Sequence, residues 1–177
     1  MIRLTAFDPE GFKIWHERQL EQSRYECQKH GEYPPRVFLV CRRCPVSGEI
    51  HPAPAPFLAL PQSFVGDGEK TAFETGVRHL AAAGDAVAMV FLSETWALSH
   101  DLSIEDFERE LARCGGRPRA SRHRIEEIVA ITEEIGRVRV HSATITRTKR
   151  GKAIVLPYVL RLDTPAWPEG GFMRNVL

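Results

Sequence analysis

The sequence lacks the long apolar runs that would place it in a membrane. No run approaches the roughly 20 residues that a helix needs to cross a bilayer. The opening stretch MIRLTAFDPEGF also has neither the basic start nor the apolar centre of a signal peptide. We therefore expect a soluble protein of the cytoplasm with no membrane partner.

A large net charge is absent too. The chain has 24 Lys and Arg against 23 Asp and Glu, which gives a formal net charge of +1. A chain so close to neutral has no overall field that would draw it to nucleic acid or to an acidic membrane. Any preference for an anionic partner must therefore come from local clusters of charge.

Motifs that would name a reaction are missing as well. Ser93 stands in no G-x-S-x-G turn, and GDGEK at 66–70 lacks the remaining spacing of a phosphate-binding loop. The stretch SETWALSHD (93–101) holds Ser, Glu, His and Asp at the end of an expected strand, where active sites often sit. Most strand ends are polar for no catalytic reason, so we expect a protein that is not an enzyme, and a site built from separated residues stays open.

Length and composition favour one globular domain. The chain has 177 residues, of which 43% are apolar and 27% charged, and a domain of this size buries about 70% of its unfolded surface. Residues 1–163 are expected to form a single α+β domain. Residues 164–177, rich in Pro and Gly, are expected to form an irregular C-terminal tail.

The first two thirds alternate between helical and strand patterns. A helix is expected from Asp8, a possible N-cap followed by Pro9, to a stop at Gly31. Ser103 is expected to cap a short helix that Gly115 ends. Three further segments are a helix over 67–84, a short buried strand over 36–41 and a central strand over 85–96.

Prolines interrupt the segment between the first strand and the second helix. They are Pro45, Pro52, Pro54, Pro56 and Pro61. Proline forbids a helix interior and confines a strand to the edge of a sheet. We expect an extended connector with a short strand over 57–60.

The last third is rich in β-forming residues. Three runs, at 124–134, 137–148 and 152–162, are joined by short turns, which predicts an antiparallel meander. The fold class that follows is α+β, with a mostly antiparallel sheet of about five strands and two or three helices on one face.

Two pairs of metal-binding residues lie near the first strand. Cys27-x2-His30 and Cys41-x2-Cys44 supply four ligands of the type that zinc prefers, and the two-residue gaps let both members of each pair coordinate the same single ion. A structural zinc ion is therefore one hypothesis, and no other cofactor is expected. Alternatively, the CRRC spacing is that of a redox pair, or the thiols are ordinary buried cysteines.

Two basic segments carry the densest charge. The first, RCGGRPRASRHR (113–124), contains Arg113, Arg117, Arg119, Arg122 and Arg124 with no acid among them, and the second contains Arg147, Lys149, Arg150 and Lys152 at a hairpin tip. Arginine grips phosphate or carboxylate groups in two places. If both segments lie on one face, they would bind a phosphodiester backbone; otherwise each is a solvated loop.

Four stretches follow one another in a familiar arrangement: PPRVFLV, LAAAGDAVAMVFLSETW, EEIVAIT and RTKRGKAIVL. Over about residues 35–156 the chain resembles small uncharacterised proteins of bacterial genomes and prophages, in which a strand ending in Glu, a small residue and Trp precedes an antiparallel pair. Glu94, Thr95 and Trp96 would be that element. The resemblance carries no activity and implies an accessory protein that binds a host component.

We therefore expect a non-catalytic binding protein, a phage or mobile-element factor that engages or inhibits a host protein or nucleoprotein complex. The basic segments would contact the partner, with Trp96, Trp167 or Tyr158 as aromatic anchors. An open edge of the meander would allow a homodimer by sheet extension. The alternatives are a zinc-stabilised nucleic-acid-binding protein and an enzyme.

Overall fold

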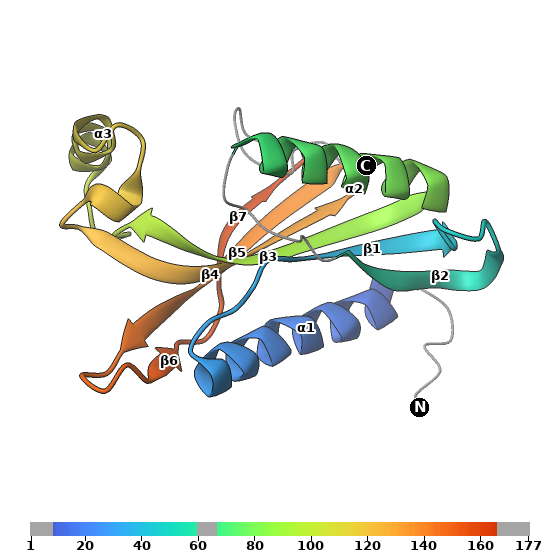
Figure 1. Cartoon of the computed structure of the whole chain (residues 1–177), viewed down its shortest axis with the longest axis horizontal. Helices are drawn as coiled ribbons and strands as arrows, with labels where there is room; N and C mark the ends of the chain where they lie inside the picture. The colour runs from blue at the N-terminus through green and yellow to red at the C-terminus, as the bar shows by residue number, and fades with distance from the viewer. Residues whose placement is uncertain (1–8, 60–66, 166–177) are drawn as a thin grey trace.

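One antiparallel sheet organises the chain. The computed structural model describes residues 9–59 and 67–165. Within these ranges the strands follow the order β2-β1-β3-β4-β5-β6, with β7 also paired to β5, and all pairings are antiparallel (Figure 1). The expected α+β class is confirmed, and the described part of the sheet has seven strands rather than about five.

The elements have the following bounds. The helices are α1 (Pro9–His30), α2 (Asp67–Gly84) and α3 (Ile104–Arg113), and a 3₁₀ turn, η1, covers Pro118–Ala120. The strands are β1 (Arg36–Arg43), β2 (Ile50–Ala59), β3 (Ala86–Leu98), β4 (Arg124–Glu134), β5 (Arg137–Arg147), β6 (Ala153–Val155) and β7 (Val159–Thr164).

The helices do not share one face of the sheet, so that expectation was wrong. Figure 1 shows α1 below the sheet and α2 above it. The α1 side buries one apolar cluster that includes Trp15, Cys27 and Val90, and the α2 side buries another that includes Cys41, Val77 and Met89. The central strand β3 supplies both clusters because alternate side chains of a strand point to opposite faces. This two-sided burial explains its near-continuous apolar sequence.

The ends of the helices follow the sequence signals. Gly31 has φ +83° and donates its backbone N–H to Cys27 O at 2.8 Å, which closes α1. Ser103 caps α3 by accepting a hydrogen bond from Asp106 N at 3.1 Å. The possible cap of the first helix, Asp8, lies outside the described residues. Among the helices described, none is long and apolar enough to cross a membrane.

The proline-rich segment forms more structure than expected. Instead of a short strand over 57–60, β2 runs from Ile50 to Ala59 along the outside of β1. It lies at the edge of the sheet, as the prolines require. The expectation failed because a proline is tolerated in a strand wherever its nitrogen, which carries no hydrogen, faces away from the neighbouring strand. An edge strand allows this at every second residue.

The C-terminal meander is confirmed, with one break. β4, β5 and β6 follow one another in antiparallel pairing. β7 then pairs with the same side of β5 as β6 does, but nearer the start of β5. The break falls at Leu156–Tyr158, where Pro157 cannot donate a ladder hydrogen bond. β7 ends at Thr164, and residues 166–177 of the expected tail lie outside the described part of the chain.

Candidate functional site

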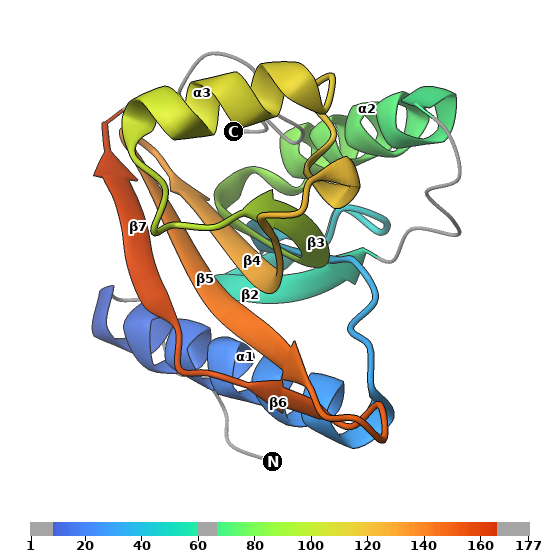
Figure 2. The same cartoon turned by 90° about the vertical axis from the view of Figure 1, so that its left-hand side faces the viewer.

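The two basic segments lie at the same end of the sheet. β4 begins at Arg124, where the first segment ends, and β5 ends at Arg147, where the second begins. Glu126 pairs with Ile145, and continuing this register by two residues places Arg124 opposite Arg147. Figure 2 looks onto this end, with η1 above and the β5–β6 hairpin below. We call the surface made by residues 113–124 and 147–152 the charged end.

Five cations of the charged end are exposed and have side chains that form no ion pair, hydrogen bond or cation–π contact within residues 9–59 and 67–165. They are Arg117, Arg119, Lys149, Arg150 and Lys152. All five lie in the loop around η1 or at the tip of the β5–β6 hairpin. An exposed charge without a partner breaks no contact within the protein when it binds a ligand, so these side chains are available to an anion.

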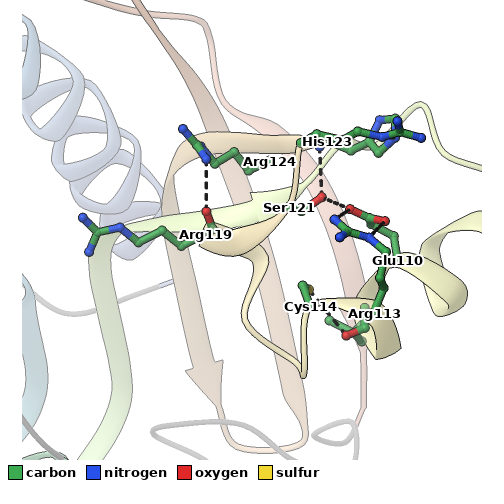
Figure 3. Close-up of polar contacts among 9 residues, drawn as sticks. Glu110, Arg113, Cys114, Arg119, Ser121, His123 and Arg124 are labelled. Atoms are coloured by element: carbon green, nitrogen blue, oxygen red, sulfur yellow. Dashed lines mark hydrogen bonds and ion pairs between the residues drawn. The ribbon is translucent and has the colours of Figure 1, made fainter.

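The first basic segment is held against α3 by a buried carboxylate (Figure 3). Arg113 donates two hydrogen bonds to Glu110, both at 2.7 Å. Ser121, which is fully buried, donates to the same carboxylate and accepts from His123 N at 2.9 Å. The hydrogen bonds from Arg113 and Ser121 lower the pKa of Glu110 to about 2. This carboxylate therefore stays ionised and fixes the loop.

Arg124 connects the loop to the sheet. Its guanidinium carbon lies 5.4 Å from the centre of the Trp96 ring, and its Nη1 donates to the carbonyl of Arg119 at 3.2 Å. Trp96 is 36% exposed. Sequence reasoning found no aromatic residue among the basic segments, but the sheet places Trp96 beside one, because Trp96 pairs with Glu126 of β4.

Tyr158, the second suggested aromatic anchor, contacts α1 instead of this surface. Tyr158 is half-buried, and its hydroxyl is 2.8 Å from Ser23 Oγ of α1. Burial raises the pKa of Tyr158. Trp167 lies outside the described residues. Of the two suggested anchors that the structure describes, Trp96 is the one beside the charged end.

Arg147 is a fixed residue of the charged end. It donates to Glu126 at 2.5 and 2.8 Å, to Glu94 at 3.1 Å and to the carbonyl of Gly31 at 2.6 Å. These contacts join α1, β3, β4 and β5, and the bonds to Glu126 raise the pKa of Arg147. Arg147 thus stabilises the end of the sheet and is not an available cation.

The two carboxylates around Arg147 have different protonation behaviour. Burial raises the pKa of Glu94 to about 7, whereas the hydrogen bonds from Arg147 lower the pKa of Glu126. The second oxygen of Glu94 accepts the backbone N–H of Tyr33 at 3.0 Å. Sequence reasoning did not join Glu94 to Glu126. The sequence carries no signal for this contact, because the register of β3 and β4 decides which of their side chains lie near each other.

The proposed zinc ligands are not brought together. Cys27 is a residue of α1 and is buried against one face of the sheet, whereas Cys41 of β1 is buried beneath α2 on the opposite face. Among residues 9–59 and 67–165, no group of three or more His, Cys, Asp or Glu is placed to hold a metal. The zinc hypothesis for Cys27, His30, Cys41 and Cys44 is therefore corrected: a two-residue gap brings each pair together but says nothing about which face a strand residue takes.

The polar residues at the end of β3 also do not converge. His100 Nε2 lies 2.6 Å from Glu127 Oε1, and Ser142 donates to the same oxygen at 2.9 Å. Ser93 instead donates to the carbonyl of Glu94 at 3.1 Å. His100 and Ser93 are thus used in separate local contacts, and the SETWALSHD stretch forms no shared site.

Comparisons with known proteins do not add a relative. No protein-family model matches the chain, and neither the curated proteins nor the solved structures searched contain a match. The resemblance to prophage proteins therefore stays a prediction, and the function must be inferred from the charged end itself.

Proposed function

We propose that this chain is a non-catalytic binding protein that contacts the phosphate groups of a nucleoprotein complex through its charged end. The observation that carries this proposal is the meeting of two basic segments, distant in sequence, at one end of the sheet. A role as an accessory factor of a phage or mobile element, acting on a host complex, belongs to the same proposal.

Charge and shape support phosphate as the group that is bound. The five exposed cations come from two segments on a rigid sheet, so they can follow a backbone of repeated charges rather than one carboxylate. Each phosphate that a cation neutralises releases counterions, which makes the affinity depend on salt. Trp96 lies within the same surface, where a base or an apolar partner side chain could stack.

The test is a titration of fluorescent oligonucleotides, single-stranded and duplex, at several salt concentrations. If all five cations contact phosphates, the slope of log K against log salt is about −3.5 for a single strand and about −4.5 for a duplex. Arg117→Gln/Arg119→Gln and Lys149→Gln/Arg150→Gln/Lys152→Gln should each weaken binding, and each should flatten the slope by about 0.7 to 0.9 per residue removed.

A matched control separates local from overall charge. Lys13, Arg18 and Arg43 are exposed, lie outside the charged end and form no ion pair among the described residues, so Lys13→Gln/Arg18→Gln/Arg43→Gln changes the net charge as much as the hairpin triple. Equal weakening by the control would overturn the proposal. If host protein is recovered with the chain after nuclease treatment and lost with the hairpin triple, the partner is an acidic protein surface instead.

A further inference from the structure

A cleft of about 780 Å³ opens between α3 and the loop around η1. Its lining includes three guanidinium groups, Arg109 and Arg113 on α3 and Arg122 on the loop, together with the ring of His123. Arg113, Ala120, Arg122 and His123 belong to the charged end, but none of the five exposed cations invoked for nucleoprotein binding is in this lining. The cleft therefore needs its own explanation.

The two acids in the cleft are already committed to partners within the protein. Glu110 is 8% exposed and holds Arg113 and Ser121. Asp106 accepts from Arg109 at 2.8 Å and from the Ser103 hydroxyl at 2.8 Å. These bonds hold the guanidinium groups of Arg109 and Arg113 in place, which lowers the entropy that is lost when a ligand binds.

Several donors of the cleft remain unused. Arg113 bonds through Nε and Nη2, and Arg122 bonds through Nε to His123 Nε2 at 3.1 Å. The Nη1 of Arg113 and both terminal nitrogens of Arg122 form no hydrogen bond within the described residues. Three guanidinium groups against two carboxylates leave an excess of positive charge facing the cleft.

This arrangement fits a compact dianion better than a carboxylate. Planar guanidinium groups on both sides of a cleft can each donate two hydrogen bonds to the oxygens of one phosphate. Leu102 and Ala120 supply apolar lining for a small carbon body. His123 is the aromatic ring in the described lining, and its Nε2 already accepts a hydrogen bond from Arg122. The described lining contains no Phe, Tyr or Trp ring, so the phosphate itself is the group recognised.

We propose that the cleft between α3 and η1 binds the terminal phosphate of a phosphomonoester. The phosphate lies between Arg109 and Arg113 on one side and Arg122 on the other. The same chemistry is present in a free sugar phosphate and in the 5′-phosphate of a nucleic-acid strand. Both sources contain the doubly charged group that the excess of guanidinium favours.

The experiment is an NMR titration of the full chain with glucose 6-phosphate, with glucose as the uncharged probe. We expect shifts confined to the amides of α3 and of residues 117–123, and none with glucose. Arg109→Gln/Arg122→Gln should weaken binding by at least about tenfold, since each lost hydrogen bond to a charged group is worth a factor of that order. Lys13→Gln/Arg18→Gln, a control of equal charge, should bind as the wild type does.

A second arm compares oligonucleotides with a 5′-phosphate and with a 5′-hydroxyl. A preference for the phosphate that Arg109→Gln/Arg122→Gln abolishes assigns the cleft to strand ends, whereas glucose 6-phosphate binding without that preference assigns it to a small ligand. The proposal is overturned if the chain neither binds glucose 6-phosphate nor prefers the 5′-phosphate strand. It is also overturned if the wild type and Arg109→Gln/Arg122→Gln bind equally. Binding of the 5′-hydroxyl strand depends on the five exposed cations, none of which lines the cleft, so failure of the cleft leaves the proposed function testable.

Discussion

Gly84 tests the packing of α2 against the sheet. It is the last residue of α2 and lies against Cys41 of β1, so that a Cβ at position 84 would be 2.5 Å from Cys41 Sγ and 2.9 Å from Cys41 Cβ. Cys41 is fully buried, and its Cβ moves only with the strand. Gly84→Ala should therefore cost about 1–3 kcal/mol of overpacking, offset by up to about 1 kcal/mol of helix propensity.

The assay is thermal and urea unfolding of Gly84→Ala beside Gly76→Ala. A Cβ at Gly76 meets nothing within 4 Å, so that variant should gain about 0.5–1 kcal/mol. For a chain of this length each kcal/mol moves Tm by about 2–4 °C. Cys41→Ala in the Gly84→Ala background removes the nearest atom and should recover part of the loss. If Gly84→Ala proves as stable as Gly76→Ala, α2 does not pack on β1 as described.

Three further predictions concern single side chains. The pKa of Glu94 is raised to about 7, so the stability that its protonated form contributes is complete below the unfolded pKa and is lost as pH rises through 7. Urea unfolding at about pH 5 and pH 8 should therefore show a fall in the free energy of unfolding on the order of 1–2 kcal/mol, after allowance for solvent screening. Glu94→Gln should not show this fall. Thr132→Val removes the partner that lies 2.8 Å from buried His16 Nε2 and should cost about 1–3 kcal/mol in the same assay, whereas an unchanged midpoint would mean that His16 needs no partner. Iodoacetamide followed by mass spectrometry should label Cys44, whose pKa is lowered by hydrogen bonds with Ser47, well before Cys27, whose pKa burial raises to about 11; the reverse order would contradict the placement of α1.

Elements with a strong local signal could be predicted from the sequence. α1 ends at Gly31 because only a residue that accepts positive φ closes the helix there. β3 was predicted from its apolar run, and the turns of the meander from their short connections. These features depend on neighbours in the sequence, which is why a single sequence suffices for them.

Features that depend on pairing could not be predicted. Cys27 and Cys41 are separated by the thickness of the sheet, a fact that no spacing records. The contacts of Arg147 with Glu94 and Glu126 need the register of three strands. The basic segments were found in the sequence, but only the sheet shows that Arg147 is occupied and that Trp96 lies beside Arg124.

The prolines of β2 determine how copies of this chain can associate. Pro56 is the register partner of Val40, and Pro52 and Pro54 lie where the register shifts between the pairs Cys41–Ala55 and Arg43–Ile50. None of the three prolines can donate a ladder hydrogen bond, so a second chain would find no continuous ladder along β2. Growth of the sheet into a fibre needs two open edges, and this one is closed. In the described sheet, extension between two copies would have to use the opposite edge, which β6 and β7 form, and this limits such an assembly to a closed pair.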